Sequence, residues 1–309
     1  MEVVRTVWTR FFDRTATQSY ARSSSRIFLI LTLPALLLHT AFFAYPVVMG
    51  FFFSLTDWDG ISKKYNIIGF ANYLEILKDK RFLDSLLFSF KYTLLAVVLK
   101  MAIALALALL LSGNVKFRNF MRSVFFFPAV LSLITIGLIF NQIYYEILPK
   151  AGEALGIEWL SVNILGSAKT AIYGLIITNV WHGVAVPMII FLAGLTSVPK
   201  DLHEAARIDG ATGLQRFFSI TLPFLIPMLN VNLVVTIKGG LTVFESIVAL
   251  TDGGPGTSTE SIAFLIYRHG LNEFKFGYAT AESIYIFLLI AFISFIQLKW
   301  LNKKEVGQL

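Results

Sequence analysis

The sequence contains no cysteine, and only 15% of its 309 residues are charged. The absence of cysteine excludes disulfides and thiolate metal sites. An ordinary soluble domain is about one quarter charged, whereas 56% of these residues are hydrophobic and the mean hydropathy is +0.72. A soluble chain of this composition would have too few polar residues to cover its surface. The composition therefore predicts an integral membrane protein.

The sequence also lacks the motifs of common catalytic and nucleotide-binding sites. No G-x-x-x-x-G-K-[ST] pattern occurs, so we expect no P-loop, and GGPG at 253–256 is interpreted as a turn. HEAAR at 203–207 resembles the zinc-protease pattern H-E-x-x-H, but Arg207 stands where the second histidine is needed. The histidines lie on different predicted elements without metal-ligand spacing; they are His39, His182, His203 and His269. We therefore expect no catalytic residue, metal site or cofactor in this chain.

Six apolar runs are long enough to cross a bilayer, which takes about 20 residues in a helix. They lie at 27–55, 82–111, 122–144, 170–196, 224–250 and 278–300. The first run is too long for the core of a signal peptide, which has about 7–15 residues. The runs predict an all-α membrane protein with six transmembrane helices in one domain, 27–300. We expect 1–26 to form an N-terminal segment and 301–309 a tail.

The orientation of the chain follows from lysine and arginine in its short loops. With a cytoplasmic N-terminus, the inside segments hold fourteen Lys and Arg against six Asp and Glu, and the outside segments hold nine against ten. The inside segments are 1–26, 112–122, 197–223 and 299–309; the outside segments are 56–81, 145–169 and 251–277. We therefore place both termini in the cytoplasm. The net charge of +7 reports this asymmetry and not a nucleic-acid partner.

The segment 197–223 interrupts the apolar pattern with charges, glycines and two adjacent alanines. We predict two short helices. Gly210 can end the first in a left-handed conformation, and Thr212 with Gln215 fits a capping box for the second. The small side chains of Ala205 and Ala206 allow close approach of another backbone. The segment is either a knob that inserts into the cleft of a partner, with Glu204 and Asp209 available for ion pairs, or an ordinary amphipathic connector.

Three stretches of the sequence resemble one family. EAARIDGA at 204–211, followed by Phe217, Ile220, Leu222–Pro223 and Pro227, resembles the EAA loop of bacterial ABC-importer permeases of the maltose-type, carbohydrate branch. TDGGPGTST at 251–259 resembles the T-x-G-G-P element of that branch, which is typical of the first of its two permease subunits. WHGVAVPMIIFLAGLTSVPKDLHEAA, which begins at Trp181, is similar as well. The resemblance is close over about the last 130 residues.

The resemblance implies a type I ABC-importer permease bundle in the bacterial cytoplasmic membrane. The chain would form half of a channel that imports a sugar by alternating access. Its partners would be a second permease subunit, two cytoplasmic ATPase subunits that bind ATP and Mg²⁺, and an extracellular solute-binding protein. The EAA loop would dock in a groove of the ATPase. The residues expected in this coupling are Glu204, Ala205, Ala206, Asp209, Gly210 and Gly213.

The substrate path is expected between the fourth and fifth spans. Residues at i, i+3, i+4 and i+7 share a helix face, and this spacing joins Asn179, His182, Gly183 and Val186 in one span and Thr236, Gly240 and Val243 in the next. By resemblance, all of these except Asn179 fall at sugar-contacting positions. The alternative is that the small residues only let helices pack closely. On the first interpretation, Gly240→Trp would block uptake without preventing assembly.

Lys238 lies near the middle of the fifth span, where a lone charge costs about 2.5–3.5 kcal/mol. We favour an ion pair with Glu245 or Glu282 over sugar contact for this lysine.

Other functions and substrates stay open at this point. A secondary transporter is disfavoured because intramembrane carboxylates are sparse, and a membrane enzyme because no cluster of catalytic groups is found. Within the importer interpretation, the substrate is expected to be a di- or oligosaccharide, with a polyol or glycerol phosphate as the alternative.

Overall fold

The computed structural model describes residues 30–113 and 115–301. The predicted N-terminal segment 1–26 lies outside the described residues, as does the predicted tail beyond Leu301. Within these ranges the chain is almost entirely helical, and its β-pairing is limited to an isolated bridge between Thr56 and Ile67. The predicted all-α fold is therefore confirmed.

Six candidate spans occur in the described ranges, at the places that the apolar runs predict. Four are helices long and apolar enough to cross a membrane, and two are helix pairs bent at a short break. The four are Ile30–Phe53, Lys80–Ser112, Gly213–Leu241 and Phe276–Trp300. The pairs are Arg118–Val130 with Leu133–Leu155, bent by 93°, and Ala171–Gly183 with Ala185–Ser197, bent by 47°.

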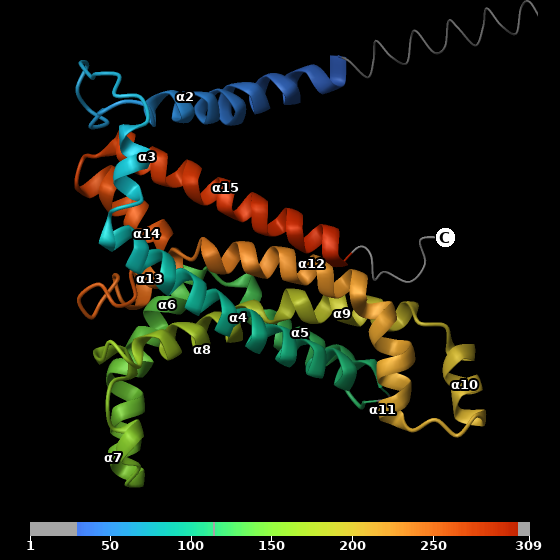
Figure 1. The fold of residues 1–309 in the computed structure, drawn as a ribbon. Helices are drawn as coiled ribbons and strands as arrows, with labels where there is room; N and C mark the ends of the chain where they lie inside the picture. The colour runs from blue at the N-terminus through green and yellow to red at the C-terminus, as the bar shows by residue number, and fades with distance from the viewer. Residues whose placement is uncertain (1–29, 114, 302–309) are drawn as a thin grey trace, which may run out of the picture.

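The helical elements follow one another along the chain (Figure 1). Up to the second bent pair they are η1 (Thr40–Ala44), α2 (Tyr45–Phe53), α3 (Ala71–Ile76), α4 (Lys80–Ser112), α5 (Arg118–Val130), α6 (Leu133–Gln142), η2 (Ile143–Ile147), α7 (Leu148–Leu155), η3 (Glu158–Leu160) and η4 (Ile164–Gly166). From that pair onward they are α8 (Ala171–Gly183), α9 (Ala185–Ser197), α10 (Lys200–Ile208), α11 (Gly213–Arg216), η5 (Phe217–Thr221), α12 (Leu222–Leu241), α13 (Glu245–Leu250), α14 (Ile262–Tyr267), η6 (Arg268–Asn272) and α15 (Phe276–Leu301).

The fifth span differs from the prediction at both of its ends. It begins at Gly213, because α11, η5 and α12 form one continuous helix to Leu241. The predicted second short helix is therefore the start of this span, and Pro223 does not close the loop. At the other end, the chain breaks after Leu241 and resumes as the separate helix α13. An apolar run fixes where a span lies, but it does not show where the helix within it stops.

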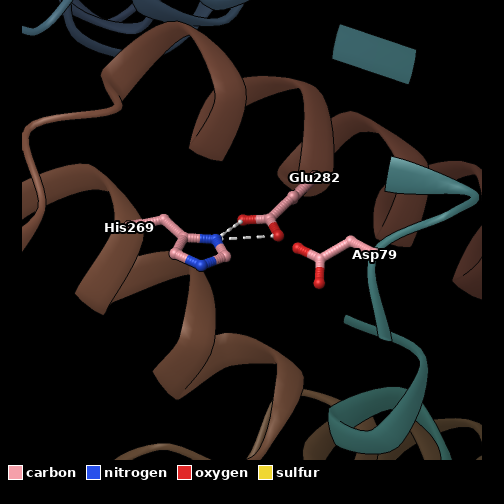
Figure 2. Close-up of side chains that lie close together, drawn as sticks. All are labelled: Asp79, His269 and Glu282. Carbon is pink, nitrogen blue, oxygen red and sulfur yellow. Dashed lines mark hydrogen bonds and ion pairs between the residues drawn. The ribbon is translucent and has the colours of Figure 1, made fainter. Parts of the chain in front are cut away.

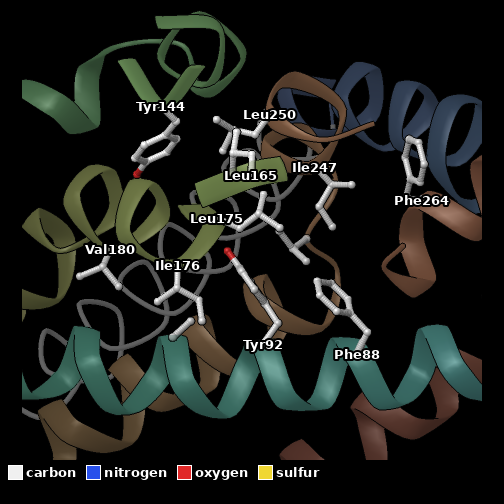
Figure 3. Close-up of a cluster of buried hydrophobic side chains, with 12 residues drawn as sticks. Phe88, Tyr92, Tyr144, Leu165, Leu175, Ile176, Val180, Ile247, Leu250 and Phe264 are labelled. Atoms are coloured by element: carbon white, nitrogen blue, oxygen red, sulfur yellow. The ribbon is translucent and has the colours of Figure 1, made fainter. Parts of the chain in front are cut away.

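Helix α4 lies at the centre of the bundle and packs along α9 and α12. Figure 3 shows the buried cluster at one end of this packing, where Phe88 and Tyr92 of α4 point toward Leu175 and Ile176 of α8 and Ile247 of α13. A second buried cluster joins the other half of α4 to α9 and includes Ala104, Met188 and Phe191. The core therefore follows α4 along its length.

The first span, Ile30–Phe53, lies apart from this core. It diverges from α15 along its length (Figure 1), and its most apolar window has no buried residue. Phe42 and Phe43 are among its exposed side chains. Since only its C-terminal part, α2, packs on α15, most of this span is available to lipid or to another chain.

An ion network joins the start of α4 to the loop before α14. Arg81 binds Glu260 through Nε and Nη2, each at 2.8 Å, and Glu273 through Nη1 at 2.7 Å. Arg268 Nη1 donates to Glu260 at 3.1 Å. Although burial opposes it, hydrogen bonds from Arg81 and Lys275 lower the pKa of Glu273 to about 2. The Glu260 side chain is only 1% exposed, so the two arginines compensate a buried charge.

Candidate functional site

Helix α10 stands beyond the ends of the spans, at the same end of the molecule as the C-terminal end of α15 (Figure 1). None of its residues is buried, and Ile208 is 86% exposed. Leu202, on the same short helix, is exposed as well. The helix therefore makes little contact with the rest of the described chain and presents both apolar and charged side chains on its surface.

The turn after α10 is built as the sequence predicts. Gly210 has a φ of +78° and its N–H donates to the Arg207 carbonyl at 3.1 Å, while the Ala211 N–H donates to the Ala206 carbonyl. The capping box is also present: the Thr212 N–H donates to Oε1 of Gln215 at 2.8 Å. A left-handed residue followed by a capped helix start fixes the angle between α10 and the fifth span.

The side chains predicted for coupling lie on this exposed unit. Glu204, Ala205 and Asp209 are exposed and Ala206 is half-buried. Neither carboxylate has an ion-pair partner within the part of the chain that the structure describes. Gly213 is exposed, and a Cβ added there would meet nothing within 4 Å. The surface is thus open, with acidic groups beside small side chains.

A second candidate site lies where the two bent spans meet. The break between α5 and α6 contains Leu131, and the break between α8 and α9 follows Gly183. His182 Nε2 lies 3.2 Å from the Leu131 carbonyl oxygen, so the tautomer protonated at Nε2 donates to it. Non-helical backbone at membrane depth is tolerated where it is buried in protein or lines a cavity, and discontinuous helices of this kind form substrate sites in transporters.

Lys100 of α4 lies against this second break. A Cβ added to Gly183 would be 2.7 Å from Lys100 Nζ, so the ammonium group is directly beside the glycine. Lys100 has no ion-pair partner among the described residues. The sequence pattern did not single it out as a site residue, because contact between α4 and α8 is not visible in the spacing of either helix.

The residues predicted to line the substrate path divide into two groups. In the α8–α9 pair, Asn179, His182 and Gly183 are half-buried and Val186 is 48% exposed, so this face is partly open. In contrast, Thr236, Gly240 and Val243 are buried inside this chain. These three do not lie on an open face of this chain, because Thr236 and Gly240 are on the side of α12 that packs on α4, and Val243, just after α12, belongs to the first core cluster. Their place in the substrate path stays a prediction.

Gly240 makes the closest of these contacts. A Cβ added there would lie 2.7 Å from Thr93 Oγ1 and 2.8 Å from its Cγ2, whereas a Cβ at Gly239 would meet nothing within 4 Å. We expect Gly240→Ala to lower the free energy of unfolding by about 1–3 kcal/mol through overpacking. Gly239→Ala is the matched control, and it should leave the thermal unfolding midpoint unchanged or raised. Equal midpoints for the two variants would contradict the close packing.

The same contact changes the expectation for Gly240→Trp. An indole at Gly240 would separate α12 from α4, so this variant should fail to assemble. This result differs from the sequence-based expectation, in which the variant assembles and blocks uptake. The amount of folded chain recovered from membranes measures the difference.

Lys238 is exposed and lies beside a cavity that Ser283 and Ile286 of α15 also line. The predicted ion pair with Glu245 or Glu282 is not formed among the described residues, and Glu282 is instead bound to His269. Asp79 lies next to this pair, so three groups far apart in the sequence come together at the other end of α15. No spacing in the sequence indicates this cluster, since each residue stands on a different element.

Comparison with known proteins identifies the family. Residues 100–305 match the family described as "Binding-protein-dependent transport system inner membrane component". The chain is 39% identical over 88% of its length to the multiple sugar-binding transport system permease protein MsmF of Streptococcus mutans, 93% of which is covered. It is 32% identical over 93% of its length to the trehalose/maltose transport system permease protein MalF of Thermococcus litoralis, 97% of which is covered.

A solved structure shares the fold. It is a bacterial ABC transporter that imports the acidic polysaccharide alginate, with a TM-score of 0.79 and 20% identity, covering 91% of this chain and 96% of the other. That likeness confirms the predicted permease fold. The family match covers two thirds of the sequence, and the two relatives are matched over most of their length. The chain therefore belongs to the family of binding-protein-dependent transport system inner membrane components.

Proposed function

We propose that the chain is the first of two permease subunits of an ATP-driven importer for a di- or oligosaccharide. The observation that carries this proposal is the exposed α10 unit, whose Glu204 and Asp209 lack partners within the described chain. The names of the relatives support the substrate class, since MsmF and MalF are permeases of sugar transport systems. A secondary transporter would have no need for such a docking unit.

The partners follow from the surfaces that this chain leaves open. Two ATPase subunits hold ATP and Mg²⁺, and one of them receives α10 between basic groups that pair with the two free carboxylates. The second permease subunit covers the first span, whose apolar residues are unburied here. An extracellular solute-binding protein delivers the sugar to the end of the bundle opposite α10. This chain itself performs no catalysis.

The sugar passes beside the α8–α9 break. His182, Gly183 and Val186 present a partly open face there, and Lys100 supplies a hydrogen-bond donor. The buried Thr236, Gly240 and Val243 act indirectly, because they set how closely the fifth span approaches α4. Alternating access then consists of movement of the fifth span and the bent pair relative to α4 when the ATPases close.

The experiment is uptake by proteoliposomes that contain the complete complex and its solute-binding protein, with ATP inside the vesicles. We expect labelled di- or oligosaccharides to be accumulated and ATP to be hydrolysed in proportion. Polyols and glycerol phosphates are tested in parallel, and preferential uptake of either would replace the substrate class. Accumulation of sugar by vesicles without ATP or without the ATPase subunits would contradict the importer mechanism.

A further inference from the structure

Three ionisable side chains from separate elements meet near the external end of the bundle. Asp79 precedes α4, His269 belongs to η6 and Glu282 lies in α15, and one potential ligand atom from each falls within 4.8 Å of the others. Figure 2 shows the imidazole facing the Glu282 carboxylate with the Asp79 carboxylate beside it. His269 is 3% exposed and Glu282 is 0% exposed. The cluster therefore brings together the start of α4, η6 and α15.

His269 and Glu282 form a hydrogen-bonded pair whose atoms are also close enough to bind one cation. Nδ1 of His269 is 3.0 Å from both Oε1 and Oε2 of Glu282. One imidazole nitrogen carries at most one proton, so it can satisfy only one of these oxygens with a linear hydrogen bond. Zinc binds histidine nitrogen and carboxylate oxygen at about 2.0–2.2 Å. Atoms 3.0 Å apart can both reach one such ion.

Hydrogen-bonding groups around the cluster orient its side chains, as the outer hydrogen-bond partners of a metal site orient the metal ligands. Nε2 of His269 lies 3.9 Å from Oε2 of Glu273, a distance that a bridging water or a small movement would close. When the imidazole is neutral and its proton is on Nε2, Nδ1 is unprotonated and its lone pair faces Glu282. The Tyr278 hydroxyl donates to Asp79 Oδ2 at 3.0 Å, and the Arg81 backbone N–H donates to Asp79 Oδ1 at 2.8 Å. Both contacts fix the orientation of Asp79 and leave part of its acceptor capacity free.

The charge of the cluster is not balanced by the basic side chains nearby. Arg81 is bound to Glu260 and Glu273, and Lys275 is bound to Glu273. Apart from His269, Glu282 has no cationic partner within ion-pair distance in the described part of the chain. A buried carboxylate needs a paired charge or a metal. A protonated His269 would balance one of the two carboxylates, Glu282 and Asp79, whereas a neutral His269 would leave two negative charges together.

The cluster can be reached from outside the bundle. A cavity of about 300 Å³ opens beside it, and its lining includes Asp79, His269 and Tyr278. The carboxylates of Asp57, Glu75 and Asp79 line this cavity together with one ammonium group, that of Lys275, so the balance of charge favours the entry of a cation. Helix α3, which carries Glu75, lies at the end of the molecule opposite α10 (Figure 1).

We propose that Asp79, His269 and Glu282 form a binding site for one divalent transition-metal cation of the zinc class. One nitrogen with carboxylate oxygens suits Zn²⁺ or Mn²⁺, whereas Mg²⁺ and Ca²⁺ prefer oxygen alone. The ion links the start of α4, η6 and α15 at the external end of the bundle. This site differs from the sequence-based expectation that the chain holds no metal.

The test uses the full-length chain purified with its partner subunits, first stripped with EDTA and then titrated with Co²⁺ or Zn²⁺. We expect one equivalent of Co²⁺ to give visible absorption bands that Zn²⁺ abolishes, and Zn²⁺ to raise the thermal unfolding midpoint. Removal of an outer partner of a metal ligand lowers metal affinity about 10–100-fold. His269→Gln and Glu282→Gln each remove a ligand itself, so each should weaken Zn²⁺ binding by more than that. His39→Gln, at an exposed histidine, is the control and should bind Zn²⁺ as the wild type does.

These readouts do not depend on transport, so they separate this site from the proposed importer function. If a variant fails to fold, the Co²⁺ titration of the wild-type complex still decides. Wild-type complex without Co²⁺ bands and without a Zn²⁺-dependent shift would show that the cluster is an ordinary buried hydrogen-bonded group. Binding that survives in both Gln variants would place the ion elsewhere.

Discussion

Glu204→Lys and Ala206→Phe should each reduce ATP-driven uptake at least about fivefold, since overpacking or charge reversal at a packed interface costs about 1–3 kcal/mol or more. Ala206 is half-buried on a helix with no buried residue, so part of its surface is open and a phenyl ring there would enlarge the surface that the proposed ATPase contacts. The Glu204→Lys change would place a positive charge where the proposal expects basic groups of the ATPase. Both changes lie outside the spans, so the chain should still insert. Uptake and co-purification of ATPase subunits measure the effect.

Helix α7 provides matched controls, because it is a short exposed helix at the other end of the bundle. Ala154→Phe and Glu153→Lys introduce the same side chains at exposed positions there. Both variants should keep the ATPase subunits, and the amount that co-purifies is compared with that of the two α10 variants. If Glu204→Lys and Ala206→Phe behave like the α7 variants, α10 is only a connector and the proposed coupling role is wrong.

Arg81→Met should lower the free energy of unfolding by about 3 kcal/mol, the lower end of the range for breaking a buried ion pair. Glu260 is almost fully buried and accepts two hydrogen bonds from Arg81. Arg268 remains to compensate part of the charge, which keeps the loss from being larger. The thermal unfolding midpoint of the purified complex measures it, and the loop from Thr251 to Glu260 should become accessible to protease first.

Lys80→Met is the control for this variant, because Lys80 is the exposed neighbour of Arg81 and has no ion pair among the described residues. It should leave the midpoint unchanged. Arg81→Lys should be intermediate, since an ammonium group keeps the charge but cannot form the paired contact of a guanidinium. A midpoint for Arg81→Met equal to that of Lys80→Met would show that Arg268 alone neutralises Glu260.

Features with a local physical cause could be predicted from the sequence. A span needs a long apolar run, so each predicted run overlaps one of the four helices or two bent pairs, although the bounds of the fifth differ. The left-handed turn at Gly210 and the capping box at Thr212 depend on residues within a few positions, and both are present. The exposed α10 followed from charges and small side chains between two apolar runs.

Features that depend on which helices touch could not be predicted in this way. Periodicity places Thr236, Gly240 and Val243 on one face, but it cannot show that α4 covers this face. In a membrane protein both the buried and the lipid-facing surfaces of a helix are apolar, so residue polarity hardly distinguishes one from the other. The contact of Lys100 with Gly183 also depends on which helices touch, so the sequence did not reveal it. The same holds for the cluster of Asp79, His269 and Glu282.

The fifth span is continuous but bent. Gly213–Leu241 is one helix of 29 residues, and its first part, α11 with η5, stands at a steep angle to α12 (Figure 1). Its first turn carries the capping box beside α10, and Gly240, near its far end, packs against Thr93 of α4. No non-helical residue separates the two ends, so a displacement of α10 would pass through η5 to α12 and change how closely α12 approaches α4.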